Sequence, residues 1–214
     1  MCNLNDHNAP AVYLFSTITA LISCAQPRLP DDLWISGEKD IEWLSLLRGI
    51  RSIIDAGGDN LKYGILEPML KNGWRRGRAW AARPPGNWAH LNHLRYLLEE
   101  RVSDKTVCQH YLNAVDDMKK SFATVAEIGH RNCETADVFI WLMRVSDDYL
   151  HLLRQRKPEA MVIFSYFCVI TYELEWAWWM QGLSIHLMRG IYFALDDEYR
   201  GWLKWPMKQL NWTP

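Results

Sequence analysis

The stretch PEAMVIFSYFCVITYEL, residues 158–174, decides the fold class of this chain. Between Glu159 and Glu173 it carries no charge and is apolar on nearly every side of a helical cylinder, the pattern of a helix buried all round. Pro158 stands where a first helical residue is expected, because the fixed φ of proline suits that position. The stretch is shorter than the roughly 20 apolar residues of a membrane span. We therefore expect a central buried helix and no membrane span.

The rest of the chain is also predicted to be helical. Apolar side chains recur at helical spacing within residues 40–56, 105–125, 135–153 and 178–195. The uncharged segment 9–26 is interpreted as a buried first helix that starts near Pro10, since an export signal would begin with Lys or Arg. No alternating strand pattern pairs with another. The expectation is one all-α domain over residues 1–214, with a central buried helix and an apolar pocket.

The least regular part is predicted at residues 73–87, where three glycines and two prolines gather. We expect a surface loop there, or a lid. Three arginines alternate in it with Trp74 and Trp80, a pattern that can grip single-stranded nucleic acid. The chain as a whole is nearly neutral, so we interpret this run as a loop whose Trp side chains fold back on the body.

Composition narrows the class of protein further. The 214 residues hold 24 basic and 25 acidic side chains, and a net charge of -1 lacks the bulk attraction to nucleic acid or anionic membranes. The 12 Trp residues indicate an unusually aromatic core or a large apolar pocket. The five cysteines are scattered without a CxxC pair, which favours a reducing interior, in the cytoplasm or the nucleus.

Motifs that would indicate a known chemistry are incomplete. Three acidic runs lack the further carboxylate that Mg²⁺–diphosphate chemistry would need, and we interpret them as solvated helix ends and caps: 116–117, 147–148 and 196–198. Ser184 and His186 are two residues apart, hence on different helix faces, which disfavours a Ser–His hydrolase. The pairs His90-x-x-His93 and His130-x-x-Cys133 belong to no four-ligand set. We expect no metal and no cofactor.

Aromatic and Met residues are concentrated in the last third of the chain. They indicate either an ordinary core or a pocket, and buried Trp and Tyr with few ionisable neighbours suit a large apolar ligand oriented by one or two hydrogen bonds. The predicted ligand-binding residues are Trp43, Leu47, Trp141, Met143, Phe164, Phe167, Trp179, Met180, Leu183 and Leu187.

Four segments carry a resemblance to a known family: WLSLLRGIRSII (43–54), RKPEAMVI (156–163), WWMQG with HL (178–182 and 186–187) and YRGWLKWP (199–206). They resemble the C-terminal regulatory domain of fungal zinc-binuclear-cluster transcription factors of the sterol uptake control type. This resemblance spans residues 11–205 and implies a helical, often dimeric domain that holds an ergosterol-like ligand. The six closely spaced cysteines of the family's DNA-binding module do not occur here, so we expect no direct DNA binding.

Two hypotheses about function follow. The first is a stand-alone domain, as a single chain or a homodimer, that binds a hydrophobic sterol- or terpenoid-like molecule. The alternative is a cofactor-independent enzyme of fungal secondary metabolism that catalyses a cyclisation or pericyclic reaction of Diels–Alder type, by holding an apolar substrate and polarising it with a hydrogen bond. For that reaction His186 and Tyr172 are the predicted catalytic residues, with Arg48 and Arg51 as weaker candidates.

Overall fold

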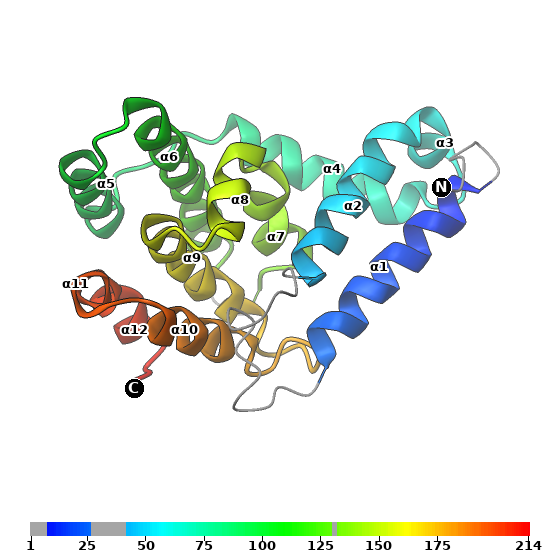
Figure 1. The fold of residues 1–214 in the computed structure, drawn as a ribbon. Helices are drawn as coiled ribbons and strands as arrows, with labels where there is room; N and C mark the ends of the chain where they lie inside the picture. The colour runs from blue at the N-terminus through cyan, green and yellow to red at the C-terminus, as the bar shows by residue number, and fades with distance from the viewer. Residues whose placement is uncertain (1–7, 27–41, 130–131) are drawn as a thin grey trace.

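The computed structural model describes residues 8–26, 42–129 and 132–214, and these residues are all helical or irregular, as predicted (Figure 1). The helices in chain order are α1 (Ala9–Ala25), α2 (Glu42–Ala56), α3 (Gly58–Tyr63), α4 (Glu67–Ala82), α5 (Ala89–Arg101), α6 (Lys105–Ile128), α7 (Thr135–Arg144), α8 (Asp147–Arg154), α9 (Pro158–Thr171), η1 (Tyr172–Leu174), α10 (Leu183–Ala194), α11 (Asp197–Arg200), η2 (Gly201–Leu203) and α12 (Lys204–Gln209). No helix in these ranges is long and apolar enough to cross a membrane.

Helix α9 lies at the centre of the molecule and confirms the prediction from residues 158–174. It contacts α6, α7, α8, α10 and α12, which surround it (Figure 1). Eleven of its 14 residues are buried. Each large apolar side chain buried in this way contributes about 1.5–3 kcal/mol to folding, so α9 is the main source of core area.

Helices α1 and α2 pack side by side and carry the N-terminal part of the fold (Figure 1). Of the apolar stripe predicted in α2, Leu47 and Ile50 are buried, and Leu44, which the stripe did not include, is buried beside them. The polar face of α2 serves a structural purpose, because Arg48 donates to the backbone oxygens of Met143 and Val145, at 2.8 and 3.2 Å. These carbonyls lie at the C-terminal end of α7, where helical carbonyls lack partners, so Arg48 fastens α2 to that end.

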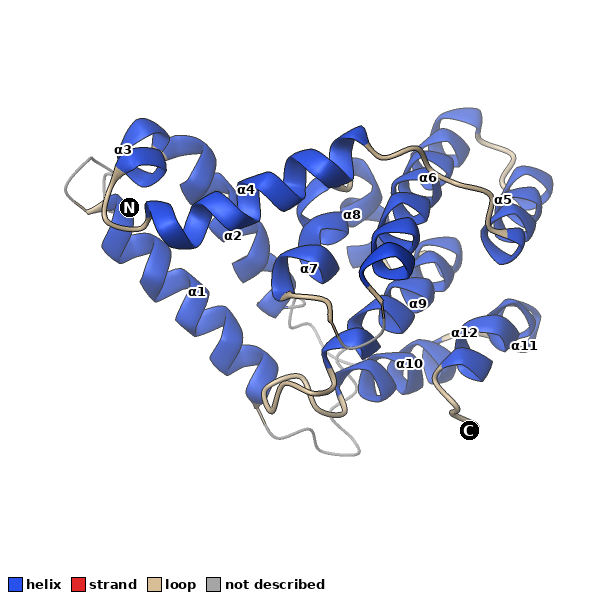
Figure 2. Ribbon diagram, turned by 180° about the vertical axis from the view of Figure 1, so that it is seen from behind, coloured by secondary structure: helices blue, strands red, loops and turns tan. Residues whose placement is uncertain are grey.

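The prediction of a loop at residues 73–87 is wrong over most of that range, because α4 continues to Ala82. Gly73 and Gly77 are both helical, and packing does not require glycine at residue 77, since a Cβ there would make only ordinary contact with Cδ1 of Ile140, at 3.5 Å. The helix runs from the α3 end of the molecule toward α6 (Figure 2) and ends at Arg83, because a residue before proline avoids the helical conformation. Trp80 does fold back: it is buried and its Nε1 donates to Ser121 Oγ at 2.8 Å.

The prediction of a helix at residues 178–195 is wrong for the first turn. Residues 172–182 form η1 and irregular turns, and α10 begins at Leu183 after Gly182, whose φ of 73° is left-handed. Glycine adopts that conformation without steric cost. The Glu175 carboxylate holds the turn by accepting from the Gly182 N–H at 2.8 Å. Trp178 is therefore outside the helix, and its side chain is 75% exposed.

Caps fix the starts of three other helices. Asp104 accepts from the backbone N–H groups of Thr106 and Val107 at the start of α6. Ser146 caps α8 by accepting from the Tyr149 N–H. Glu134 caps α7 and forms a reciprocal capping box with Asp137. Such caps satisfy backbone donors that have no partner inside the helix.

Candidate functional site

Three of the predicted ligand-binding residues come together in the centre of the fold. Trp141 of α7 stacks on Phe167 of α9 with ring centroids 5.1 Å apart, and Phe164 lies 5.4 Å from Phe167. Tyr149 of α8 completes the group, edge-on to Trp141 at 5.6 Å. We call these four side chains the Trp141 core.

Every polar ring atom of the Trp141 core has a protein partner. Trp141 Nε1 donates to the backbone oxygen of Ala114 at 2.9 Å, and the Tyr149 hydroxyl donates to that of Ala160 at 2.9 Å. Burial raises the pKa of Tyr149 well above its usual range, so the hydroxyl keeps its proton. This satisfied arrangement is typical of packing interior.

The remaining predicted residues are distributed around this core. One hydrophobic cluster includes or contacts nine of the ten: Leu47, Trp141, Met143, Phe164, Phe167, Trp179, Met180, Leu183 and Leu187. Met143 and Trp179 are half-buried and pack against its edge. The tenth, Trp43, has a side chain outside the described part of the structure.

The predicted catalytic residues lie in two different elements. Tyr172 begins η1 with its side chain 38% exposed, and His186 is half-buried in α10. The neighbouring Ser184 is fully buried, with its hydroxyl 3.1 Å from that of Thr171. A buried serine held by threonine does not face a substrate, which agrees with the low expectation of a Ser–His hydrolase.

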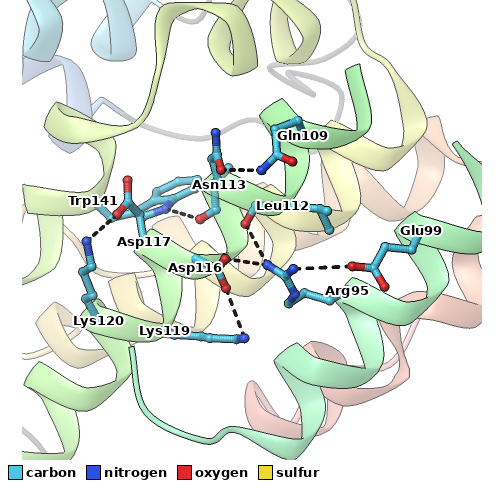
Figure 3. A network of polar contacts seen from close by, with 11 residues as sticks. Arg95, Glu99, Gln109, Leu112, Asn113, Asp116, Asp117, Lys119, Lys120 and Trp141 are labelled. Atoms are coloured by element: carbon cyan, nitrogen blue, oxygen red, sulfur yellow. Dashed lines mark hydrogen bonds and ion pairs between the residues drawn. The ribbon is translucent and has the colours of Figure 1, made fainter. Parts of the chain in front are cut away.

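The acidic doublet at residues 116–117 was expected at a helix end but lies in the middle of α6 (Figure 3). Asp116 pairs with Arg95 and, at 3.1 Å, with Lys119. Asp117 pairs with Lys120 at 2.9 Å. Asp116 therefore joins α6 to Arg95 of α5, whereas the pair of Asp117 and Lys120 lies within α6. In the described residues no group of three or more His, Cys, Asp or Glu side chains is placed to hold a metal ion.

A second aromatic group lies where α5, α6, α9 and α12 meet, and we call it the His90 box: Trp88, His90, Phe122, Tyr166 and Trp205. His90 stacks flat on Trp205, with centroids 3.7 Å apart and an interplanar angle of 5°. Tyr166 also stacks on Trp205, at 5.2 Å. Phe122 meets the His90 ring edge-on at 5.2 Å, and Trp88 lies 6.0 Å from it. His90 is thus part of an aromatic group.

Local sequence explains how Trp88 and His90 reach this place. Residues 83–88 form the connection between α4 and α5, and Gly86 turns it with a φ of 71°. A Cβ on residue 86 would lie 2.8 Å from Trp88 Nε1, so only glycine allows the indole to pack there. Trp88 then occupies the position just before α5, which places His90 in the first turn of that helix.

Two buried ring nitrogens of the His90 box are unusual. Trp88 Nε1 and His90 Nε2 are both inaccessible to solvent and have no hydrogen-bond partner among the described residues. Burial lowers the pKa of His90 from 6.5 to about 4, so its imidazole is neutral at pH 7. Buried polar atoms normally have partners, and those that lack one in the protein are candidates for contact with another molecule.

Sequence reasoning missed this group. Its members span residues 88–205, and the only local signal was the Trp88-x-His90 pair next to the proline–glycine turn. No spacing rule links that pair to Trp205 in the C-terminal segment.

Comparisons with known proteins give a distant similarity. The chain is 18% identical over 221 aligned positions to a "Zn(2)-C6 fungal-type transcription factor" of Gibberella zeae, an alignment that covers 96% of this chain and 43% of that protein. The chain thus spans less than half the length of this relative. No family model matches the chain, and no solved structure matches it. The similarity supports a relationship to fungal transcription factors.

Proposed function

We propose that this chain is a regulatory-type domain that binds an apolar small molecule of the sterol or terpenoid class, with the polar end of that molecule at the His90 box. Distant similarity to a fungal transcription factor along 96% of the chain supports a regulatory role. The ligand itself is inferred from the site.

One observation carries this proposal: two buried ring nitrogens that have no partner among the described residues lie among aromatic side chains. Leaving such an atom unpaired costs about 1–3 kcal/mol, a cost that a bound polar group removes. The surrounding rings of Phe122, Tyr166 and Trp205 offer apolar contact area to a ligand. They place little restriction on the direction from which it packs. A few polar atoms in apolar walls are the usual composition of a small-molecule site.

Thermal unfolding with a panel of sterols and terpenoids tests the proposal. A ligand at 100 times its Kd stabilises the folded state by about 2.7 kcal/mol, which for a chain of this size raises the melting temperature by roughly 5–10 °C. Trp178→Ala, at an exposed site, should show the same shift as the natural chain. A panel that leaves the melting temperature unchanged would contradict the proposal.

The second candidate is the cofactor-independent cyclisation or pericyclic reaction. The observation that favours it is the Trp88 N–H, a donor without a protein partner in the described structure. Such a donor in an apolar site can stabilise charge that develops on a substrate carbonyl. Incubation with a linear substrate that carries a diene and an enone tests it. Acceleration that Trp88→Phe abolishes would support catalysis, whereas a rate equal to that in buffer would exclude it for that substrate.

A further inference from the structure

Helix α1 has an apolar face that stays exposed in the described structure. One side of the helix holds the buried residues Ala9, Ala20 and Cys24, and the helix packs against α2 and α3. Four apolar side chains on the opposite side are 37 to 72% exposed: Leu14, Phe15, Ile18 and Ile22. Their helical spacing places them in one stripe along the helix. We call these four side chains the α1 face.

This exposure contradicts the expectation that residues 9–26 form a buried helix. The segment has no charged side chain and is apolar on two opposite sides, a pattern typical of a helix that is covered on both. Here α2 and α3 pack on one side, and the α1 face remains open to solvent. An exposed apolar patch of this kind marks a site of contact with another molecule.

Other exposed apolar side chains gather at the two ends of α1. Segment 63–69 joins α4 to α3, which contacts α1 near the N-terminal end of that helix (Figure 1). Figures 1 and 2 both place segment 172–178 beside the C-terminal end. The exposed apolar residues of these segments are Tyr63, Ile65, Met69, Tyr172, Trp176 and Trp178. Among the large apolar side chains that are exposed in the described residues, only Tyr96 and Phe193 lie elsewhere.

The threonine hydroxyls that flank the α1 face are satisfied within the helix. Thr17 Oγ1 donates to the backbone oxygen of Tyr13 at 2.9 Å. Thr19 Oγ1 donates in the same way to the backbone oxygen of Phe15, at 2.8 Å. Because these donors are used and α1 carries no charge, the face offers little to the polar rim that protein interfaces have. The hydrocarbon of a bilayer, in which unpaired donors are costly, suits such a helix better.

The aromatic residues at the C-terminal end of α1 favour the same occupant. Trp176 and Trp178 are 59 and 75% exposed. Trp side chains prefer the boundary between water and hydrocarbon, because the ring is apolar and its N–H can stay hydrated. The net charge of the chain is -1, so attraction to anionic headgroups adds little and apolar contact supplies the affinity.

We infer that the α1 face docks on the surface of a lipid bilayer. Helix α1, about 25 Å long for its 17 residues, lies in the plane of the interface, and the α1 face enters the boundary between headgroups and acyl chains. The helix does not cross the bilayer. This surface is separate from the His90 box, so the inference does not depend on ligand binding there.

Flotation of the natural chain with phosphatidylcholine vesicles tests the inference. We expect a partition coefficient on the order of 10⁴ M⁻¹, similar to that of one myristoyl chain, so about half of the protein floats at roughly 0.1 mM accessible lipid. Raising NaCl from about 0.1 M to about 0.5 M should leave the bound fraction unchanged, because salt screens charges and does not weaken apolar contact. Adding phosphatidylserine should not increase it.

Variants that introduce a charge locate the contact. Phe15→Asp and Ile18→Asp should each lower the partition coefficient by at least about tenfold, because a carboxylate enters an apolar layer only at a high cost. Tyr96→Asp places the same charge at an exposed aromatic residue of α5 and is the matched control, which should bind like the natural chain. All three positions are exposed, so each variant should keep its melting temperature within about 2 °C.

The inference is overturned if the natural chain does not float with about 1 mM phosphatidylcholine. It is also overturned if Phe15→Asp and Ile18→Asp float as well as Tyr96→Asp. Binding that requires phosphatidylserine and is lost at the higher salt would show that charge carries the contact. A stable dimer in sedimentation velocity that Phe15→Asp converts to a monomer would show that a second copy of the chain covers the α1 face instead.

Discussion

The Trp141 core and the His90 box are built from similar rings, and α9 contributes to both. In the Trp141 core the indole and phenol donate to backbone oxygens of Ala114 and Ala160. In the His90 box the indole of Trp88 and the imidazole of His90 have buried nitrogens without described partners. In this fold the candidate binding site therefore differs from packed interior in its unpaired polar atoms, and not in its aromatic content.

The comparison predicts its largest effect in the Trp141 core. Trp141→Ala should lower the free energy of unfolding by about 3–5 kcal/mol, since it opens a cavity in the interior and removes a buried hydrogen bond. Urea unfolding measures it. The exposed Trp178→Ala should change stability by no more than about 0.5 kcal/mol. Equal losses in the two variants would show that the Trp141 core is not the packing centre.

Acid should act through the His90 box. The folded-state pKa of His90 is about 4 against 6.5 when unfolded, so the unfolded chain takes up the proton first as the pH falls. The stability that neutral His90 provides is complete above pH 6.5 and is lost as the pH falls toward 4, by about 1–2 kcal/mol for this half-buried ring. Urea unfolding at pH 7 and pH 4.5 should show a smaller loss for His90→Phe than for the natural chain. Parallel losses would contradict the assignment.

A smaller effect is expected for the tyrosine of the Trp141 core. Tyr149→Phe removes the hydrogen bond to the Ala160 oxygen and should cost about 1 kcal/mol. Its difference from the natural chain should be the same at pH 7 and pH 4.5, because the Tyr149 hydroxyl stays protonated throughout. If the loss of stability caused by Tyr149→Phe differs between pH 7 and pH 4.5, the Trp141 core and the His90 box are energetically coupled.

The smallest effect is expected for His90→Phe at pH 7. Phe keeps the stacking on Trp205 and removes a nitrogen that has no described partner, so stability should stay within about 0.5 kcal/mol or rise. Chemical unfolding measures it. A loss above about 2 kcal/mol would mean that Nε2 is satisfied within the protein, and the contrast with the Trp141 core would disappear.

The sequence predicts the fold well where apolar periodicity is strong. Helices α2 and α6 form where apolar residues recur at helical spacing, because that spacing buries one face of a helix. Helix α9 forms where the sequence is apolar throughout, because every face of it is buried. Composition misled at α4, where Gly73 and Gly77 suggested a loop although both lie within the helix. The turn at Gly182 depends on a left-handed φ that apolar spacing does not reveal.

The candidate site was less accessible from sequence. Trp141, Phe164 and Phe167 could be predicted as buried, because each lies on an apolar stretch of helical spacing. The His90 box was missed because its partners come from four helices and one connection, and Trp205 reaches His90 across more than a hundred residues of chain. Tertiary packing, and not the local sequence pattern, determines which ring nitrogens have a hydrogen-bond partner.

The all-round burial of α9 also has a consequence for how the protein is made. During synthesis α9 emerges before α10 and α12, so when the chain has grown to Thr171 the faces that those helices later cover are bare. Exposed apolar surface of this kind promotes aggregation and engages chaperones. Completion of the segment Leu183–Gln209 is thus the step that makes the nascent chain soluble, and a stop codon anywhere within it should send the product to inclusion bodies or proteolysis.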